Sequence, residues 1–174
     1  AGSTISAANG ITVGKTTFEP YGVLTASNGG RVDAGTGFTL DQGGYLTVGG
    51  GMDKWVVSPG SSGPTWAAAE AAGELSGSPI TLNTGAGGLV FNHLGNITLT
   101  NAISSASATT GKVFNRAGAT TLSGDLSAFG GAVSVTGGSL RIDSDMYTGQ
   151  GHTGSSQAPL QQIDVVGGTL VLNG

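Results

Sequence analysis

Apolar residues recur two positions apart along most of this chain, usually with a polar or small residue between them. A period of two places both apolar side chains on the same face of a short strand. Successive pairs often begin seven to nine residues apart, as at Ile80, Leu89 and Ile97. The pattern predicts many strands of about four or five residues. Its ten pairs are Ile11/Val13, Phe38/Leu40, Leu46/Val48, Ile80/Leu82, Leu89/Phe91, Ile97/Leu99, Val133/Val135, Leu140/Ile142, Ile163/Val165 and Leu170/Leu172.

Glycine-containing turns separate these pairs, and they distinguish between two all-β architectures. A β-sandwich also has short, regularly spaced strands. Two inward side chains per strand cannot cover a sandwich face, however, whereas they can fill a stacked coil. The turns hold mostly glycine pairs, such as Gly43-Gly44 and Gly137-Gly138, rather than the Asn-Gly turns of hairpins. Three strands and three corners make a rung of roughly 20–30 residues, a period typical of solenoids. We therefore predict one parallel β-solenoid domain over residues 1–174.

Two stretches interrupt the alternation, about 52–74 and 144–162. The first contains both tryptophans and an alanine-rich run. In it, Thr65 could cap a short helix over Trp66–Ala72, with Gly73 as its end. Because insertions in solenoids leave at the corners, we expect both stretches to be loops projecting from a rod.

The composition narrows the function classes. Of 174 residues, 34 are glycine without a Gly-X-Y period, 37% are hydrophobic and only 9% are charged. This is neither collagen nor a disordered chain, which would combine low hydrophobicity with high charge. The net charge is −4 with six Lys and Arg, so no basic patch favours nucleic acid or an anionic membrane. No apolar run reaches 18 residues, so no transmembrane helix is expected.

Cysteine is absent from the sequence. Chance in a chain rich in small residues explains this. An equally good explanation is export through an outer-membrane pore, because an early disulfide would obstruct passage of an extended chain. The sequence alone leaves both explanations open.

The segment from Arg116 to Asp143 reads RAGATTLSGDLSAFGGAVSVTGGSLRID. It resembles the passenger-associated repeat of bacterial autotransporters. Arg116 and Thr120 depart from the repeat, which has Gly and Leu there. A partial copy returns over 166–174 and a weaker one over 43–48, so the resemblance covers residues 85–174 well and the first half loosely. The positions that match are Gly118, Leu122, Ser123, Gly124, Phe129, Gly131, Val135, Gly137, Gly138, Leu140 and Ile142.

This resemblance implies a right-handed parallel β-helix at the bacterial surface, exported through the periplasm and outer membrane by a C-terminal β-barrel translocator. Because the sequence stops within a strand pattern at Leu172, we expect it to be a fragment of a longer passenger. The implied role is a stalk serving adhesion, self-association or display, and assisting passenger folding during export. The implied partners are host or bacterial surface proteins or glycans, or further copies of the chain.

No catalytic, cofactor or metal site is predicted. His93 and His152 are interpreted as solvated loop residues, and Ser123-Gly124-Asp125 lies inside the repeat. Asp143 and Asp145 share a face but are too few for a calcium site. The main alternative is part of a carbohydrate-active β-helix enzyme. An ice-binding solenoid would need aligned Thr-x-Thr ladders, and Thr98-Leu99-Thr100 has no aligned partners two rungs away.

The aromatic residues of the two insertions are the candidate interaction residues. Trp55, Trp66 and Lys54 lie in the first insertion, and Tyr147 lies in the second. An exposed loop tryptophan is a common recognition anchor. The other interpretation, which we favour, is that each tryptophan folds back to hold its loop on the rod.

Overall fold

A computed structural model describes residues 2–14, 22–58, 61–83, 87–105, 111–144 and 162–173, without the side chains of 54–58, 61–62 and 162. Throughout these ranges the protein is all-β and contains no helix. The all-β prediction is therefore confirmed. The helix predicted over Trp66–Ala72 is wrong: Trp66 ends strand β8 (Ser61–Trp66), and strand β9 (Glu70–Ala71) follows. The helix propensity of the alanines is overridden because Glu70 and Ala71 pair with His93 and Leu94 of a neighbouring strand.

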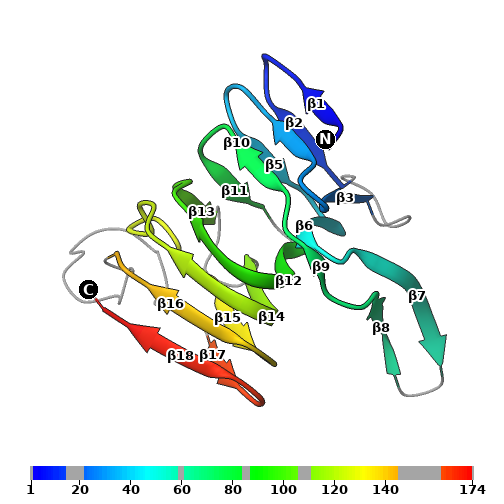
Figure 1. Cartoon of the computed structure of the whole chain (residues 1–174), viewed down its shortest axis with the longest axis vertical. Helices are drawn as coiled ribbons and strands as arrows, with labels where there is room; N and C mark the ends of the chain where they lie inside the picture. Colours follow the sequence, from blue (N-terminus) through cyan, green and yellow to red (C-terminus); the bar gives the residue numbers. More distant parts are fainter. Residues whose placement is uncertain are drawn as a thin grey trace.

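Strands from distant parts of the chain stack in parallel in three sheets (Figure 1). Sheet 1 contains β1 (Thr4–Ser6), β4 (Arg31–Asp33) and β10 (Glu74–Ser76). Sheet 2 contains β2 (Ile11–Val13), β5 (Phe38–Leu40), β11 (Ile80–Leu82) and β13 (Ile103–Ser105). The path of sheet 3 contains β3 (Gly22–Ala26), β6 (Gly44–Gly49), β12 (Gly88–Leu99), β14 (Lys112–Leu122), β15 (Ala132–Val135) and β17 (Gln162–Val165).

Two long strands extend sheet 3 around a corner. The later part of β14 pairs with β12 on one side and with β16 (Ser139–Ile142) on the other. Strand β18 (Thr169–Leu172) pairs with β16. The chain visits sheets 1, 2 and 3 in the same order with β1–β3, β4–β6 and β10–β12. This repeated order and the parallel registers are consistent with a solenoid-like class, whereas sandwich sheets are antiparallel.

The core lies between the sheets and is filled by the apolar pairs. In sheet 2, Phe38, Ile80 and Ile103 occupy one register position and are each at most 1% exposed. Eight of the ten predicted pairs have at least one buried member; the exceptions are Ile163/Val165 and Leu170/Leu172. Ile163 and Val165 are 44% and 45% exposed because β17 is the last strand of its path among the described residues. The register predicted from the two-residue period is confirmed for the buried pairs.

The first interruption forms an antiparallel hairpin that projects from the stack (Figure 1). Its strands are β7 (Met52–Ser58) and β8, and Met52 pairs with Trp66 at its base. The chain then returns to the stack through β9 and β10. Of the second interruption, residues 145–161 lie outside the described residues, so the loop predicted over 144–162 stays a prediction.

Candidate functional site

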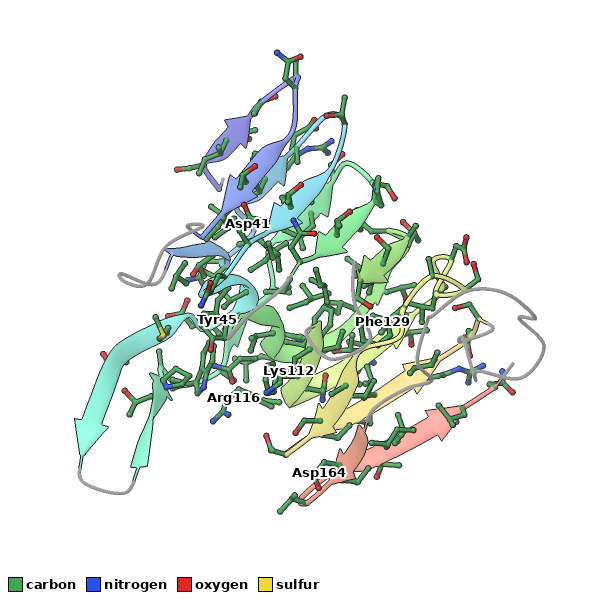
Figure 2. The ribbon with its side chains drawn as sticks, turned by 180° about the vertical axis from the view of Figure 1, so that it is seen from behind. Asp41, Tyr45, Lys112, Arg116, Phe129 and Asp164 are labelled. Atoms are coloured by element: carbon green, nitrogen blue, oxygen red, sulfur yellow. The ribbon has the colours of Figure 1, made fainter. Side chains whose placement is uncertain are left out.

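An aromatic–cation cluster forms where the hairpin meets sheet 3. The rings of Tyr45 and Trp66 meet edge to face, with centroids 5.6 Å apart and planes at 76°. The guanidinium carbon of Arg116 lies 5.3 Å from the Trp66 ring centroid, within the range of a cation–π contact. Figure 2 shows Tyr45 and Arg116 beside the base of the hairpin. Partial burial lowers the pKa of Arg116, but a guanidinium stays charged at neutral pH.

This cluster fastens the hairpin to the stack. Tyr45 is 5% exposed and comes from β6, while Arg116 comes from β14, so Trp66 bridges two strands of sheet 3. The contacts are those expected of a tryptophan that holds its insertion on the rod. They also give Arg116 a structural role as a partner of Trp66.

The remaining predicted interaction residues are placed only in part. Lys54 and Trp55 lie on β7, where they pair with Thr65 and Pro64 of β8. Their side chains, and all of Tyr147, lie outside what the structure describes. The fold therefore brings Lys54, Trp55 and Trp66 onto one hairpin and leaves the relation of Tyr147 to them as a prediction.

A buried polar network occupies the corner where β12 and β14 bend. The Thr120 hydroxyl donates to Asn115 Oδ1 at 2.7 Å, and Asn115 Nδ2 donates to the Gly137 carbonyl at 2.8 Å. The Thr120 oxygen therefore accepts from His93 Nε2, 2.9 Å away. His93 and Asn115 are 0% exposed and Thr120 is 1% exposed. Hydrogen-bonded polar groups at this depth fix the corner's geometry, because each would be costly without its partner.

The interpretation of His93 as a solvated loop residue is wrong. The imidazole is enclosed because Gly118, on the adjacent strand, leaves free the space that a side chain would occupy. A methyl group on Gly118 would collide with the His93 ring. The signal in the sequence was the glycine at position 118. Its importance could not be recognised without the register of β12 and β14, which places Gly118 next to His93. His152 lies outside the described residues.

Burial of His93 predicts a pH-dependent stability. Desolvation lowers its pKa from the ordinary 6.5, although a contact with the Leu94 carbonyl opposes this. The unfolded chain therefore takes up a proton first. The stabilising effect of neutral His93 should be fully present above about pH 6.5 and should decrease as pH falls from there toward the folded-state pKa. Urea midpoints measured from pH 8 to pH 5 should show this decrease.

The matching variant is His93→Gln, which keeps a polar side chain but does not titrate. Its midpoint should be lower than the parent's at pH 8, and the difference between the two should narrow on acidification. The pKa values of Asp125 and Asp143 are lowered by hydrogen bonds from Ser127 and Arg141, so their contributions are lost only near and below pH 3.8. Parallel profiles for parent and variant would contradict the assignment to His93.

Sheet 2 carries a hydroxyl column that sequence reasoning missed. Thr12, Thr39, Thr81 and Ser104 occupy one register position on four successive strands. Ser104 Oγ lies 3.3 Å from Thr81 Oγ1, and a shallow cavity of about 110 Å³ flanks the first three. The signal was the repeated apolar–Thr–apolar triplet at 11–13, 38–40 and 80–82. Thr98, by contrast, aligns with Thr121 and then with Arg141, so its ladder ends there.

A larger cavity of about 330 Å³ opens between β10 and the later part of β12. Glu74 and Leu75 contribute from one side, Ile97–Asn101 from the other, and Val48 of β6 also lines it. Within the described ranges it is not accompanied by any group of three or more His, Cys, Asp or Glu that could hold a metal ion. The cavity is thus lined by apolar side chains and polar strand residues.

Comparison of the chain with protein-family models, with curated proteins and with solved structures found no match. Among the described residues, no helix is long and apolar enough to cross a membrane. Any functional conclusion therefore depends on the chain's own geometry and on the resemblance of its repeats.

Proposed function

We propose that this chain is a right-handed, three-sided β-helical segment of an autotransporter-type passenger, displayed at the bacterial surface as an interaction module. Three features support the proposal. The chain visits the three sheets in a fixed order, the pairings between successive visits are parallel, and the buried apolar pairs face the space between the sheets. The repeat-like segment over 116–143 contributes the later part of β14 and all of β15 and β16 to that stack.

The projecting hairpin β7–β8 is the main support for the proposed binding role. It is an antiparallel element outside the parallel stack, and Trp66 anchors its base through Tyr45 and Arg116. It also carries Lys54 and Trp55, residue types that concentrate binding energy at one place. The proposed partner is a host or bacterial surface protein or glycan, or another copy of the passenger. In the full-length protein, a C-terminal β-barrel would serve as the translocator.

Excision of the hairpin tests the proposed binding role. Met52 pairs with Trp66, so residues 53–65 can be replaced by a two-residue Asn-Gly turn that joins paired positions. The far-UV circular dichroism of the β stack should be retained, because each rung contacts mainly its neighbours. Adhesion or aggregation of cells displaying the passenger should fall severalfold.

A matched control keeps the hairpin but replaces Trp55 with alanine. If Trp55 is an anchor, this variant should lose much of the adhesion at unchanged thermal stability. Undiminished adhesion by a correctly folded excision variant would place recognition elsewhere. Release of products from a polysaccharide by the purified parent would favour the carbohydrate-active alternative over a purely structural and interaction role.

A further inference from the structure

The cavity between β10 and β12 marks an interruption in the ladder of strands. Sheet 1 ends at β10, and residues Asn96–Leu99 of β12 pair with β14 alone in the described registers. The two segments are joined at both ends of the cavity. At one end Glu70 and Ala71 pair with His93 and Leu94. At the other, Asn101 Nδ2 donates to the Gly77 carbonyl. Between these joints lies a slot of about 330 Å³.

Backbone groups of both edges face this slot. The Glu74 amide donates to Gly30, and the Ser76 carbonyl accepts from Ala34, so both residues use their backbone groups on the β4 side. Because backbone groups alternate in direction along a strand, the N–H and C=O of Leu75 face the slot. The Leu99 carbonyl accepts from Ser123 of the β14 side, so the backbone groups of Thr98 face the slot from the opposite edge.

The inward side chains also mark a missing neighbour. Leu75 shares its register position with Val32, which is 2% exposed, yet Leu75 is only half-buried. Ile97 aligns with Thr120, which is 1% exposed, and Ile97 is likewise half-buried. Both positions lie in the middle of the stack, where inward residues elsewhere are fully covered. The apolar lining of the slot is therefore available to an incoming side chain.

Glu74 is the charged residue among those that line the slot, and its neighbours Arg31 and Asp33 lie on the adjacent strand β4. Arg31 lies 3.5 Å from Asp33 and 3.6 Å from Glu74, so one guanidinium faces two carboxylates. The Glu74 side chain, which lines the slot, is 73% exposed. An occupant with a basic side chain on its outer face would complete this charge arrangement. Because the pair is exposed, its effect should decrease with added salt.

We infer that the slot between β10 and β12 binds an extended peptide segment of a partner protein, which adds a strand that pairs with both edges. Its backbone satisfies the groups of Leu75 and Thr98, an apolar side chain enters between Leu75 and Ile97, and an outward Arg or Lys lies beside Glu74. This is strand addition of the kind seen where peptides join exposed sheet edges. The site is separate from the hairpin and does not depend on the hairpin's role.

A fluorescently labelled hexapeptide, Gly-Ser-Leu-Arg-Ile-Asp, is the test probe. It copies residues 138–143, which alternate apolar and basic positions and already form a parallel strand against β14. Fluorescence anisotropy with the whole chain should show saturable binding. The same peptide N-methylated at its Leu and Ile amides should bind at least about tenfold more weakly, because it cannot pair with one edge. Equal binding of the methylated peptide would overturn the proposal.

Two variants of the chain locate the binding. Leu75→Trp fills the slot and should weaken binding at least about tenfold. Val166→Trp, at a side chain that is 73% exposed and far from the slot lining, should leave binding unchanged. Hydrogen exchange on the unmodified chain gives an independent measurement if Leu75→Trp does not fold. The amides of Leu75 and Thr98 should become protected when the peptide is added, and the absence of that protection would overturn the inference.

Discussion

Leu140→Asp is expected to prevent cooperative folding of the stack, whereas Arg141→Asp should alter thermal stability only slightly. Leu140 is 0% exposed and lies in register between Thr120 and Leu170. Its replacement removes buried apolar area and places a carboxylate in the core, at a combined cost of several kcal/mol. Arg141 lies on the outer face, where its side chain is 50% exposed.

The Arg141→Asp variant loses one ion pair, in which Arg141 Nε lies 2.6 Å from Asp143 Oδ1. Exposed pairs of this kind contribute little to stability, and the carboxylate introduced by the substitution would repel Asp143 only weakly through solvent. Thermal denaturation of the two variants and the parent provides the measurement. Similar melting temperatures for the two variants would mean that the inward and outward assignments along β16 are wrong.

Gly118→Ala is expected to have the second large effect, through the buried corner network. Gly118 has a φ of 81°, in the left-handed region that costs other residues about 1–2 kcal/mol. An added methyl group would collide with the His93 ring and lie 2.6 Å from the His93 carbonyl oxygen. Displacing that ring breaks its hydrogen bond to Thr120 and adds an overpacking cost of about 1–3 kcal/mol.

Gly95→Ala is the control that separates backbone strain from collision. Gly95 lies at the equivalent corner of β12 with the same φ of 81°, but a methyl group there would have no atom within 4 Å. Urea denaturation should therefore show a clearly larger loss of stability for Gly118→Ala than for Gly95→Ala. Equal losses would show that the corner accommodates the methyl group without disturbing His93.

The two-residue period was enough to predict the inward faces of most strands. Pairs such as Phe38/Leu40 and Val133/Val135 are buried as expected, because a short strand has only one apolar face to bury. The period could not predict the hairpin, since β7 and β8 contain Pro64, Gly63 and adjacent valines rather than alternation. It also could not reveal that Ala71 would pair with Leu94, because that contact depends on where the insertion returns to the stack.

The candidate sites were less predictable than the fold. The tryptophans stood out by composition, but the contact of Trp66 with Arg116 joins residues 50 positions apart and requires the strand register. The slot could not be predicted from the sequence either, because it also depends on which strands pair. Leu75 and Ile97 have ordinary inward-facing positions, and only the interrupted pairing between β10 and β12 exposes them.

The interrupted pairing also has a mechanical consequence for the stack of strands. The path of sheet 3 runs through six strands from β3 to β17, whereas sheet 1 stops at β10. Under shear, a column bonded continuously along one side and parted on another bends with the bonded side as its hinge, so that the parted side opens and closes. We expect the two halves of the rod to flex at the slot, while sheet 3 and the β11–β13 pairing of sheet 2 hold them together. A strand bound between β10 and β12 would stiffen that joint, so occupancy of one small site would change how far the distal half swings.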